Sequence, residues 1–256
     1  FTQRFPPWQI FFENFSQGIH RLKEHGPDHG YTGAFGSVGM RMASWDIFCS
    51  VVDNYGDIGV TWRLARQLAG EHRQHVRLWV DDLAAFVRIC PAADATAALQ
   101  QQSGVEVRLW VKPWQDTAAA DVVIEAFACE MPAAYIDAMS RRQTPTLWLN
   151  LEYLSAESWV ESCHGLPSMQ ASGLQKYFYF PGFTSATGGL LREADLLARR
   201  DAFQADPAAS LRFLESLGVQ PHARERRISL FAYENAALGG WLDSLARGGA
   251  ASLLLV

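Results

Sequence analysis

The sequence lacks any apolar run long enough to cross a membrane, because such a helix needs roughly 18 apolar residues and the runs here are strand-sized. It also lacks a block of Lys and Arg, and its formal net charge is −5. We therefore expect neither nucleic acid nor a membrane surface as a partner. Its four cysteines form no C-x-x-C pair, so we interpret them as free thiols of a cytoplasmic protein: Cys49, Cys90, Cys129 and Cys163.

The first 41 residues differ from the rest of the chain. They lack the basic start and continuous apolar segment of a secretory signal, and their aromatic residues form no clean amphipathic face. We interpret residues 1–41 as an extension ahead of a start at Met40 or Met42. The alternative is an arm that binds a partner.

From Met42 onward, short apolar segments alternate with segments of helical spacing. Helices are expected at Val60–Glu71, Leu83–Ile89 and Ala133–Met139. Strands are expected at Trp45–Val51, Val76–Val80, Val105–Val111, Asp121–Phe127, Thr146–Leu151 and Tyr177–Phe180. This alternation is typical of βαβ units in a mainly parallel sheet with helices on both faces, so we predict an α/β, Rossmann-like domain.

The C-terminal part of the sequence begins the same pattern again. A helix-rich segment, Leu190–Leu217, is broken at Pro207 and precedes a strand at Arg227–Tyr233. A helix at Ala236–Ala246 and a strand at Ser252–Val256 follow. A buried parallel strand needs neighbours on both sides, so we expect a second βαβ domain that begins here and is cut off.

The segment between the first strand and its helix, Val52–Gly59, contains two aspartates, Asp53 and Asp57. Open α/β sheets bind ligands at this position. A dinucleotide site would have G-x-G-x-x-G here, but only Gly56 and Gly59 are present, and Asp57 near the helix start would repel a phosphate. The segment therefore favours presentation of a carboxylate to a substrate. Capping of the helix is an equally weighted alternative for either aspartate.

A second candidate cluster lies at Ser229–Asn235, again after a strand and before a helix. Phe231 and Tyr233 alternate, so they are expected on one face of the strand, where they could sandwich a nucleobase or sugar; core packing is the favoured alternative. His164 is interpreted as structural. Glu152 follows the fifth strand and could face the cleft.

Several long motifs resemble one family, the bacterial elongation factor P arginine rhamnosyltransferases. The resemblance extends from Met42 to Val256, and the motifs that carry it are Trp45–Leu64, Leu78–Asp82, Leu149–Ser155, Phe180–Phe183 and Ser229–Glu234. It implies a GT-B fold, in which two Rossmann-like domains face each other across a cleft. It assigns residues 42–183 to an acceptor domain, 184–223 to a helical linker region and 224–256 to the start of a truncated nucleotide-sugar domain.

The resemblance also implies the reaction, an inverting transfer of L-rhamnose from dTDP-β-L-rhamnose to an arginine of elongation factor P. The family's two catalytic loop aspartates correspond to Asp53 and Asp57, and its aromatic donor contacts to Phe231 and Tyr233. The turn that contains Asn54, Tyr55 and Gly56 is expected against the sugar. A later R-G-E-D-S segment of the family has no counterpart before Val256, so we expect weak donor binding by this chain.

A guanidinium is a poor nucleophile, and a carboxylate cannot deprotonate it beforehand. We therefore expect Asp57 to polarise the arginine and accept its proton as the C–N bond forms, with Asp53 orienting the guanidinium. Neither a cofactor nor a metal is expected. The alternatives are an NAD-dependent Rossmann oxidoreductase and an inert fragment that only docks elongation factor P.

Overall fold

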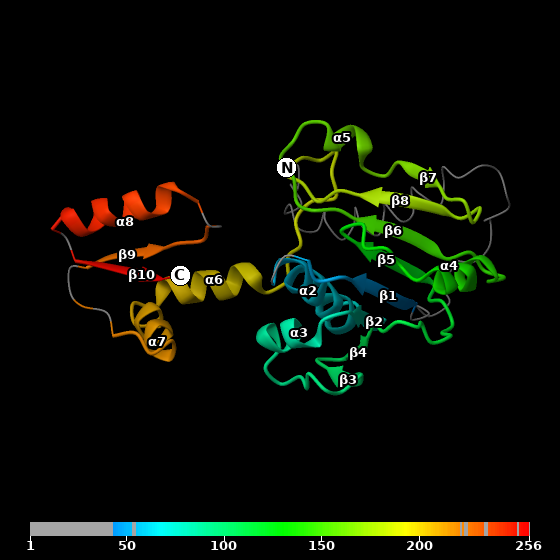
Figure 1. Ribbon diagram of the computed structural model, residues 1–256, viewed down its shortest axis with the longest axis horizontal. Coiled ribbons are helices and arrows are strands. Elements are labelled where there is room, and N and C mark those ends of the chain that lie inside the picture. Colours follow the sequence, from blue (N-terminus) through cyan, green and yellow to red (C-terminus); the bar gives the residue numbers. More distant parts are fainter. Residues whose placement is uncertain are drawn as a thin grey trace, which may run out of the picture. The chain divides into compact units, whose positions relative to one another are not determined.

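The computed structural model describes residues 43–52, 55–220, 222, 225–232, 235–249 and 251–255. The chain divides into two compact units after Glu193. No helix in these ranges is both long and apolar enough to cross a membrane. Figure 1 labels the elements of both units, and each unit is described by itself.

The N-terminal unit is built on one eight-stranded sheet (Figure 1). Its strands are β1 (Ser44–Cys49), β2 (His75–Val80), β3 (Leu99–Gln102), β4 (Val105–Leu109), β5 (Val122–Ala126), β6 (Leu147–Leu151), β7 (Pro167–Met169) and β8 (Gln175–Tyr179). Their order is β3-β4-β2-β1-β5-β6-β8-β7. The inner strands are parallel, whereas β3 and β7 pair antiparallel at the two edges. The six parallel strands follow the doubly wound order 3-2-1-4-5-6.

Helices pack on both faces of this sheet, as predicted. They are α2 (Gly56–Gly70), α3 (Leu83–Ile89), α4 (Ala133–Ser140) and the short α5 (Val160–Cys163). Alternate residues of β1 point to opposite faces. Ile47 joins the core formed with α2 and α3, and Phe48 joins the core formed with Tyr135 and Met139 of α4. The α/β class and the large parallel sheet are thus confirmed.

The structure corrects the expected start of the first helix. Val52–Gly59 was expected to be a loop, but α2 begins at Gly56. Ile58 is fully buried and Asp57 is 1% exposed, so tertiary packing outweighs the low helix propensity of Gly56 and Gly59. The two antiparallel edge strands were not predicted from the sequence.

A buried ion pair links β1 and β2 beneath α4. Arg77 donates from Nε and Nη2 to the two carboxylate oxygens of Asp46, at 2.6 and 2.5 Å. The Tyr135 hydroxyl also donates to Asp46, and Arg77 donates to the Ala118 carbonyl at 2.8 Å. Asp46 is fully buried, so these partners compensate the loss of its hydration.

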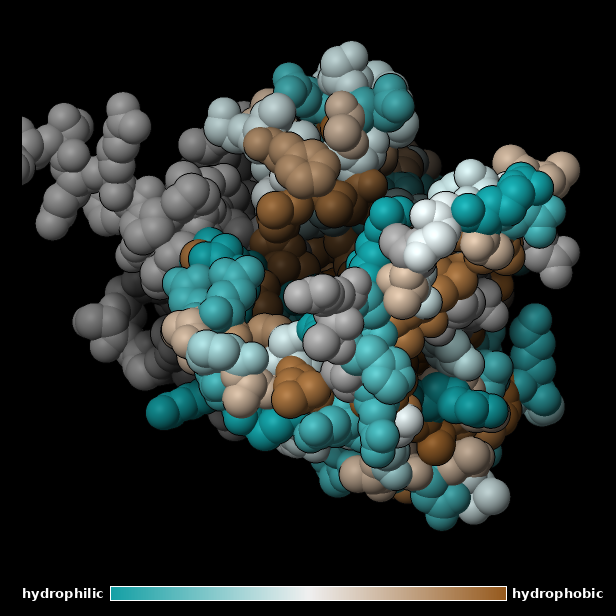
Figure 2. Space-filling model, turned by 90° about the vertical axis from the view of Figure 1, so that its left-hand side faces the viewer, coloured by the Kyte–Doolittle hydropathy of each residue, from teal (hydrophilic) through white to brown (hydrophobic). Residues whose placement is uncertain are grey.

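The C-terminal unit consists of α6 (Leu196–Ala205), α7 (Ala209–Ser216), β9 (Arg226–Ser229), α8 (Ala237–Arg247) and β10 (Ser252–Leu255). Strands β9 and β10 pair in parallel and are joined through α8, which is a βαβ arrangement. Neither α6 nor α8 buries a residue fully, and Phe203, Trp241 and Leu242 are exposed. Figure 2 shows the face of the molecule that lies on the left in Figure 1, with hydrophobic side chains (brown) at its surface.

The structure also corrects the prediction for Phe231. The sequence placed it inside a strand at Arg227–Tyr233 and favoured core packing, but β9 ends at Ser229. Phe231 lies beyond the strand and is 98% exposed. The core-packing alternative is therefore wrong for Phe231, and Tyr233 lies outside the described residues.

Candidate active site

A pocket of about 360 Å³ opens at the carboxyl ends of the parallel strands. Its lining residues follow β1, β2, β4, β5 and β6 or belong to the first turn of α2; they are Ser50, Val52, Asp57, Asp81, Trp110, Lys112, Phe127, Ala128, Cys129, Glu130 and Tyr153. The strand order reverses between β1 and β5, and doubly wound folds bind ligands at such a switch point. The pocket therefore lies where the topology favours a ligand site.

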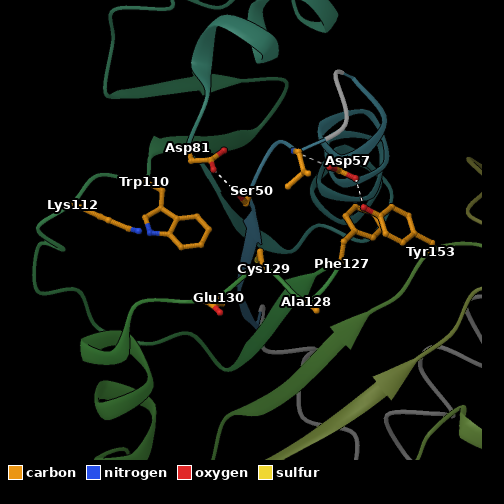
Figure 3. A pocket seen from close by; sticks show the side chains of 11 residues that line it. Ser50, Asp57, Asp81, Trp110, Lys112, Phe127, Ala128, Cys129, Glu130 and Tyr153 are labelled. Atoms are coloured by element: carbon orange, nitrogen blue, oxygen red, sulfur yellow. Dashed lines mark hydrogen bonds between the residues drawn. The ribbon is translucent and has the colours of Figure 1, made fainter. Parts of the chain in front are cut away.

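Asp57 is held in this pocket through both carboxylate oxygens. Its Oδ2 accepts a hydrogen bond from the Val52 N–H at 3.0 Å, and its Oδ1 accepts one from the Tyr153 hydroxyl at 2.8 Å (Figure 3). Thr61 donates to the Asp57 carbonyl at 2.9 Å. The N-cap of α2 is Tyr55, whose side chain makes no capping hydrogen bond. Asp57 is thus not the N-cap residue of this helix, and the capping interpretation is wrong for it.

A second carboxylate, Asp81, lies across the pocket from Asp57 (Figure 3). It follows β2 and is exposed, and its oxygens accept hydrogen bonds from the Ser50 hydroxyl at 2.5 Å and the Val51 N–H at 2.8 Å. Trp110 and Lys112 lie on the same side of the pocket. The carboxyl ends of β1 and β2 are therefore joined by Asp81.

The wall on the Asp57 side is aromatic. The rings of Phe127 and Tyr153 stack with centroids 4.2 Å apart and planes 12° from parallel. Phe127 and Ala128 both have left-handed backbone conformations, with φ of 55° and 54°. Non-glycine residues adopt this region at a cost of order 1–3 kcal/mol each, and such residues concentrate at functional sites. The Phe127 N–H donates to the Leu151 carbonyl at 2.7 Å, which holds this turn against the end of β6.

The thiols and the histidine near this edge of the sheet have structural roles. Burial raises the pKa of Cys49 and of Cys129 to about 12, so neither thiol is activated as a nucleophile. His164 accepts a hydrogen bond from the Phe180 N–H through Nδ1 at 3.1 Å, and burial lowers its pKa. The interpretation of His164 as a structural residue agrees with these contacts.

The other predicted site residues have different outcomes. Asp53 and Asn54 lie outside the described residues, as Tyr233 does. Tyr55 and Gly56 form the start of α2, but neither lines the pocket. Glu152 does not line it either; its side chain accepts from Asn150 at 2.5 Å, and the next residue, Tyr153, lines the pocket instead.

No role in the site was predicted for Tyr153, Asp81 or Phe127, and Trp110 was interpreted as a core residue, although each of the four follows a strand at its carboxyl end. Their place at the carboxyl ends of strands was the feature of the sequence that could have identified them as site residues.

The pocket lining suits a flat cation. Three acidic residues and one lysine line it: Asp57, Asp81, Glu130 and Lys112. This is a formal excess of two negative charges, which favours a positively charged ligand. A guanidinium pairs with carboxylates through two parallel hydrogen bonds and stacks on aromatic faces, and this pocket is lined by both carboxylates and aromatic rings. In the described ranges, no three His, Cys, Asp or Glu side chains are grouped so as to hold a metal ion.

The chain is similar to proteins of one family. Residues 45–256 match the model of the family "Elongation-Factor P (EF-P) rhamnosyltransferase EarP". Two relatives named "Protein-arginine rhamnosyltransferase" come from Pseudomonas aeruginosa, 67% identical over 215 residues, and Pseudomonas putida, 65% identical over 214 residues; each match covers 84% of this chain and 57% of the relative. A relative of the same name from Neisseria meningitidis is 40% identical over 213 residues, covering 82% of this chain and 53% of the relative.

A solved structure described as "Structural basis for EarP-mediated arginine glycosylation of translation elongation factor EF-P" is 42% identical, with a TM-score of 0.46. The match covers 83% of this chain and 49% of that one. The chain thus spans about half the length of the curated relatives it matches. Because the family model matches most of the chain, this protein belongs to the EarP family of elongation factor P rhamnosyltransferases.

Proposed function

We propose that this chain binds the acceptor arginine in a protein-arginine rhamnosyltransferase that modifies elongation factor P. The observation that carries the proposal is the buried Asp57 carboxylate, fixed by Val52 and Tyr153 in an acidic, aromatic pocket at the switch point of the sheet. The names of the family and of the relatives supply the acceptor, an arginine of elongation factor P. A guanidinium is the cation that this lining fits best.

In the proposed reaction, an arginine nitrogen attacks C1 of the rhamnose of dTDP-β-L-rhamnose. The C–N bond forms while the bond between C1 and the diphosphate oxygen breaks, with inversion at C1, and dTDP leaves with that electron pair. The proton released from the attacking nitrogen passes to Asp57, which acts as the general base. Asp53 orients the guanidinium, and no metal takes part. Tyr55, Gly56 and Asn54 remain predicted neighbours of the sugar.

We further propose a GT-B architecture in a cytoplasmic enzyme. The βαβ arrangement of β9, α8 and β10 supports residues 224–256 as the start of a second Rossmann-like domain, preceded by a linker at 184–223. Phe231, being almost fully exposed, and Tyr233 are the proposed aromatic contacts of the dTDP-sugar. The residues that we propose as the acceptor domain, 42–183, lie within the compact N-terminal unit, which extends to Glu193, and residues 1–41 stay an unassigned extension.

Two measurements test this function. The first is the affinity of the chain for elongation factor P and for a variant whose acceptor arginine is replaced by alanine. The second is the intact mass of elongation factor P after incubation with dTDP-rhamnose, with the Pseudomonas aeruginosa relative as the positive control.

We expect tighter binding of the arginine form. Addition of one deoxyhexose by this chain establishes transfer, whereas discrimination without transfer favours the docking fragment. Equal affinity for both forms would exclude the pocket as the arginine site. Titration with NADH tests the oxidoreductase alternative, which binding of NADH would favour.

A further inference from the structure

Tyr153 is fixed more firmly than its exposure suggests. The side chain is at the surface of the pocket and 53% of the residue is exposed. Its backbone, however, lies between two anchors: Glu152 N–H donates to the Tyr179 carbonyl at 2.9 Å, and Ser155 N–H donates to the Pro181 carbonyl at 3.2 Å. The chain that leaves β6 is therefore held against the chain that leaves β8.

The ring of Tyr153 is fixed as well. It stacks on Phe127, whose left-handed backbone directs the ring toward the end of β6. Phe127 and Ala128 are the two central residues of a tight turn, which the Cys129 N–H closes by donating to the Ala126 carbonyl at 3.1 Å, and a type I′ turn has positive φ at both of these positions. The stacked pair places the Tyr153 hydroxyl 2.8 Å from Oδ1 of Asp57, a residue 96 positions away in the sequence.

We propose that Tyr153 is a positioning residue that acts through Asp57. A carboxylate can rotate about its Cβ–Cγ bond, and only some orientations present an oxygen edge to a planar guanidinium. The Val52 N–H and the Tyr153 hydroxyl fix the two oxygens from different elements, so Asp57 holds one orientation before the arginine arrives. This inference rests on the proposed function, in which the arginine enters this pocket.

The test is the substitution Tyr153→Phe, which keeps the ring and its stacking but removes the hydroxyl. The matched control is Tyr177→Phe, which removes a hydroxyl that donates to Gln175 at 2.7 Å outside the pocket. Affinity is measured for elongation factor P and for its arginine-to-alanine form, using the full 256-residue chain.

We expect Tyr153→Phe to weaken binding of the arginine form about tenfold, the order that loss of one hydrogen bond to a charged group gives. Its affinity for the alanine form should stay unchanged, and Tyr177→Phe should change neither affinity. In an Asp57→Asn background, Tyr153→Phe should cause no further loss, because the two residues act as one unit.

Three other outcomes of these binding measurements would each contradict one part of the argument. Equal weakening of both forms of elongation factor P would show that Tyr153 only maintains the fold. An unchanged preference for the arginine form in Tyr153→Phe would overturn the positioning role and leave the proposed function standing. Absence of any preference in the unsubstituted chain would instead exclude the proposed function itself.

Discussion

Two buried aspartates allow structural and functional roles to be separated by the same substitution. Asp46 and Asp57 are each at most 1% exposed, and each accepts a hydrogen bond from a tyrosine hydroxyl. Asp46 also pairs with Arg77 in the core, whereas Asp57 lines the pocket. We expect Asp46→Asn to reduce mainly stability and Asp57→Asn to reduce mainly recognition of arginine.

The expected loss of stability in each variant depends on the groups that the new asparagine would contact. At position 57 the amide oxygen can still accept from Val52, and the Tyr153 hydroxyl can turn to accept from the new NH₂, so the cost is about 1 kcal/mol. At position 46 the Arg77 side chain, only 15% exposed, loses its counter-ion. Removing one partner of a buried pair costs about 3–5 kcal/mol. With 2–4 °C per kcal/mol, the expected falls in Tm are roughly 2–4 °C and 6–20 °C.

For binding of the acceptor arginine, we expect the larger loss in Asp57→Asn and the smaller in Asp46→Asn. Loss of the Asp57 charge should weaken binding of elongation factor P by about 2 kcal/mol, or roughly thirtyfold, and abolish the preference for the arginine form. Asp46→Asn should keep that preference at temperatures below its Tm. Thermal unfolding and calorimetric titration measure the two effects separately. Retention of the preference by Asp57→Asn would refute its role, and equal Tm values for both variants would refute the assignment of the ion pair.

Three further predictions concern the fold around the site. Burial lowers the pKa of His164, so the unfolded chain takes up a proton at a higher pH than the folded chain, and stability should fall as the pH drops below about 6.5. In urea titrations at pH 7 and pH 5, the loss of unfolding free energy should be smaller for His164→Asn than for the unsubstituted chain, and an equal loss would contradict this. A maleimide should label native protein at Cys163 alone, because the other three thiols are buried, and mass spectrometry that finds two or more labels would contradict this. Gly188→Ala would place a Cβ 2.4 Å from the buried Tyr179 ring and should lower the free energy of unfolding by about 1–3 kcal/mol, whereas the Cβ of Gly59→Ala in α2 meets no atom within 4 Å and should raise it by about 0.5–1 kcal/mol. Changes of the same sign in the two variants, measured by urea titration, would refute the packing argument.

Local patterns were sufficient to predict most elements of the N-terminal unit. The apolar stripe that contains Leu64 and Leu68 marks α2, and the strand predicted at Thr146–Leu151 differs from β6 by one residue at its start. The edge strand β3 was missed because its sequence, Leu99–Gln102, is mostly glutamine and only half-buried. Such a strand forms because it pairs with the edge of its neighbour β4. The pattern of apolar residues within Leu99–Gln102 cannot show that this pairing partner exists.

The sequence predicted part of the candidate site, and the order of the strands explains which residues were predicted and which were missed. Asp57 could be found because it lies in the first turn of the helix that follows β1, and the carboxyl ends of parallel strands are where ligands bind. Its partner Tyr153 follows β6, which lies two strands away from β1, across β5. Only the order β1-β5-β6 brings α2, the Phe127 turn and the end of β6 to one pocket, and that order depends on contacts between distant residues. A sequence can therefore indicate the residue that carries the chemistry, while the residue that orients it becomes visible when the sheet is assembled.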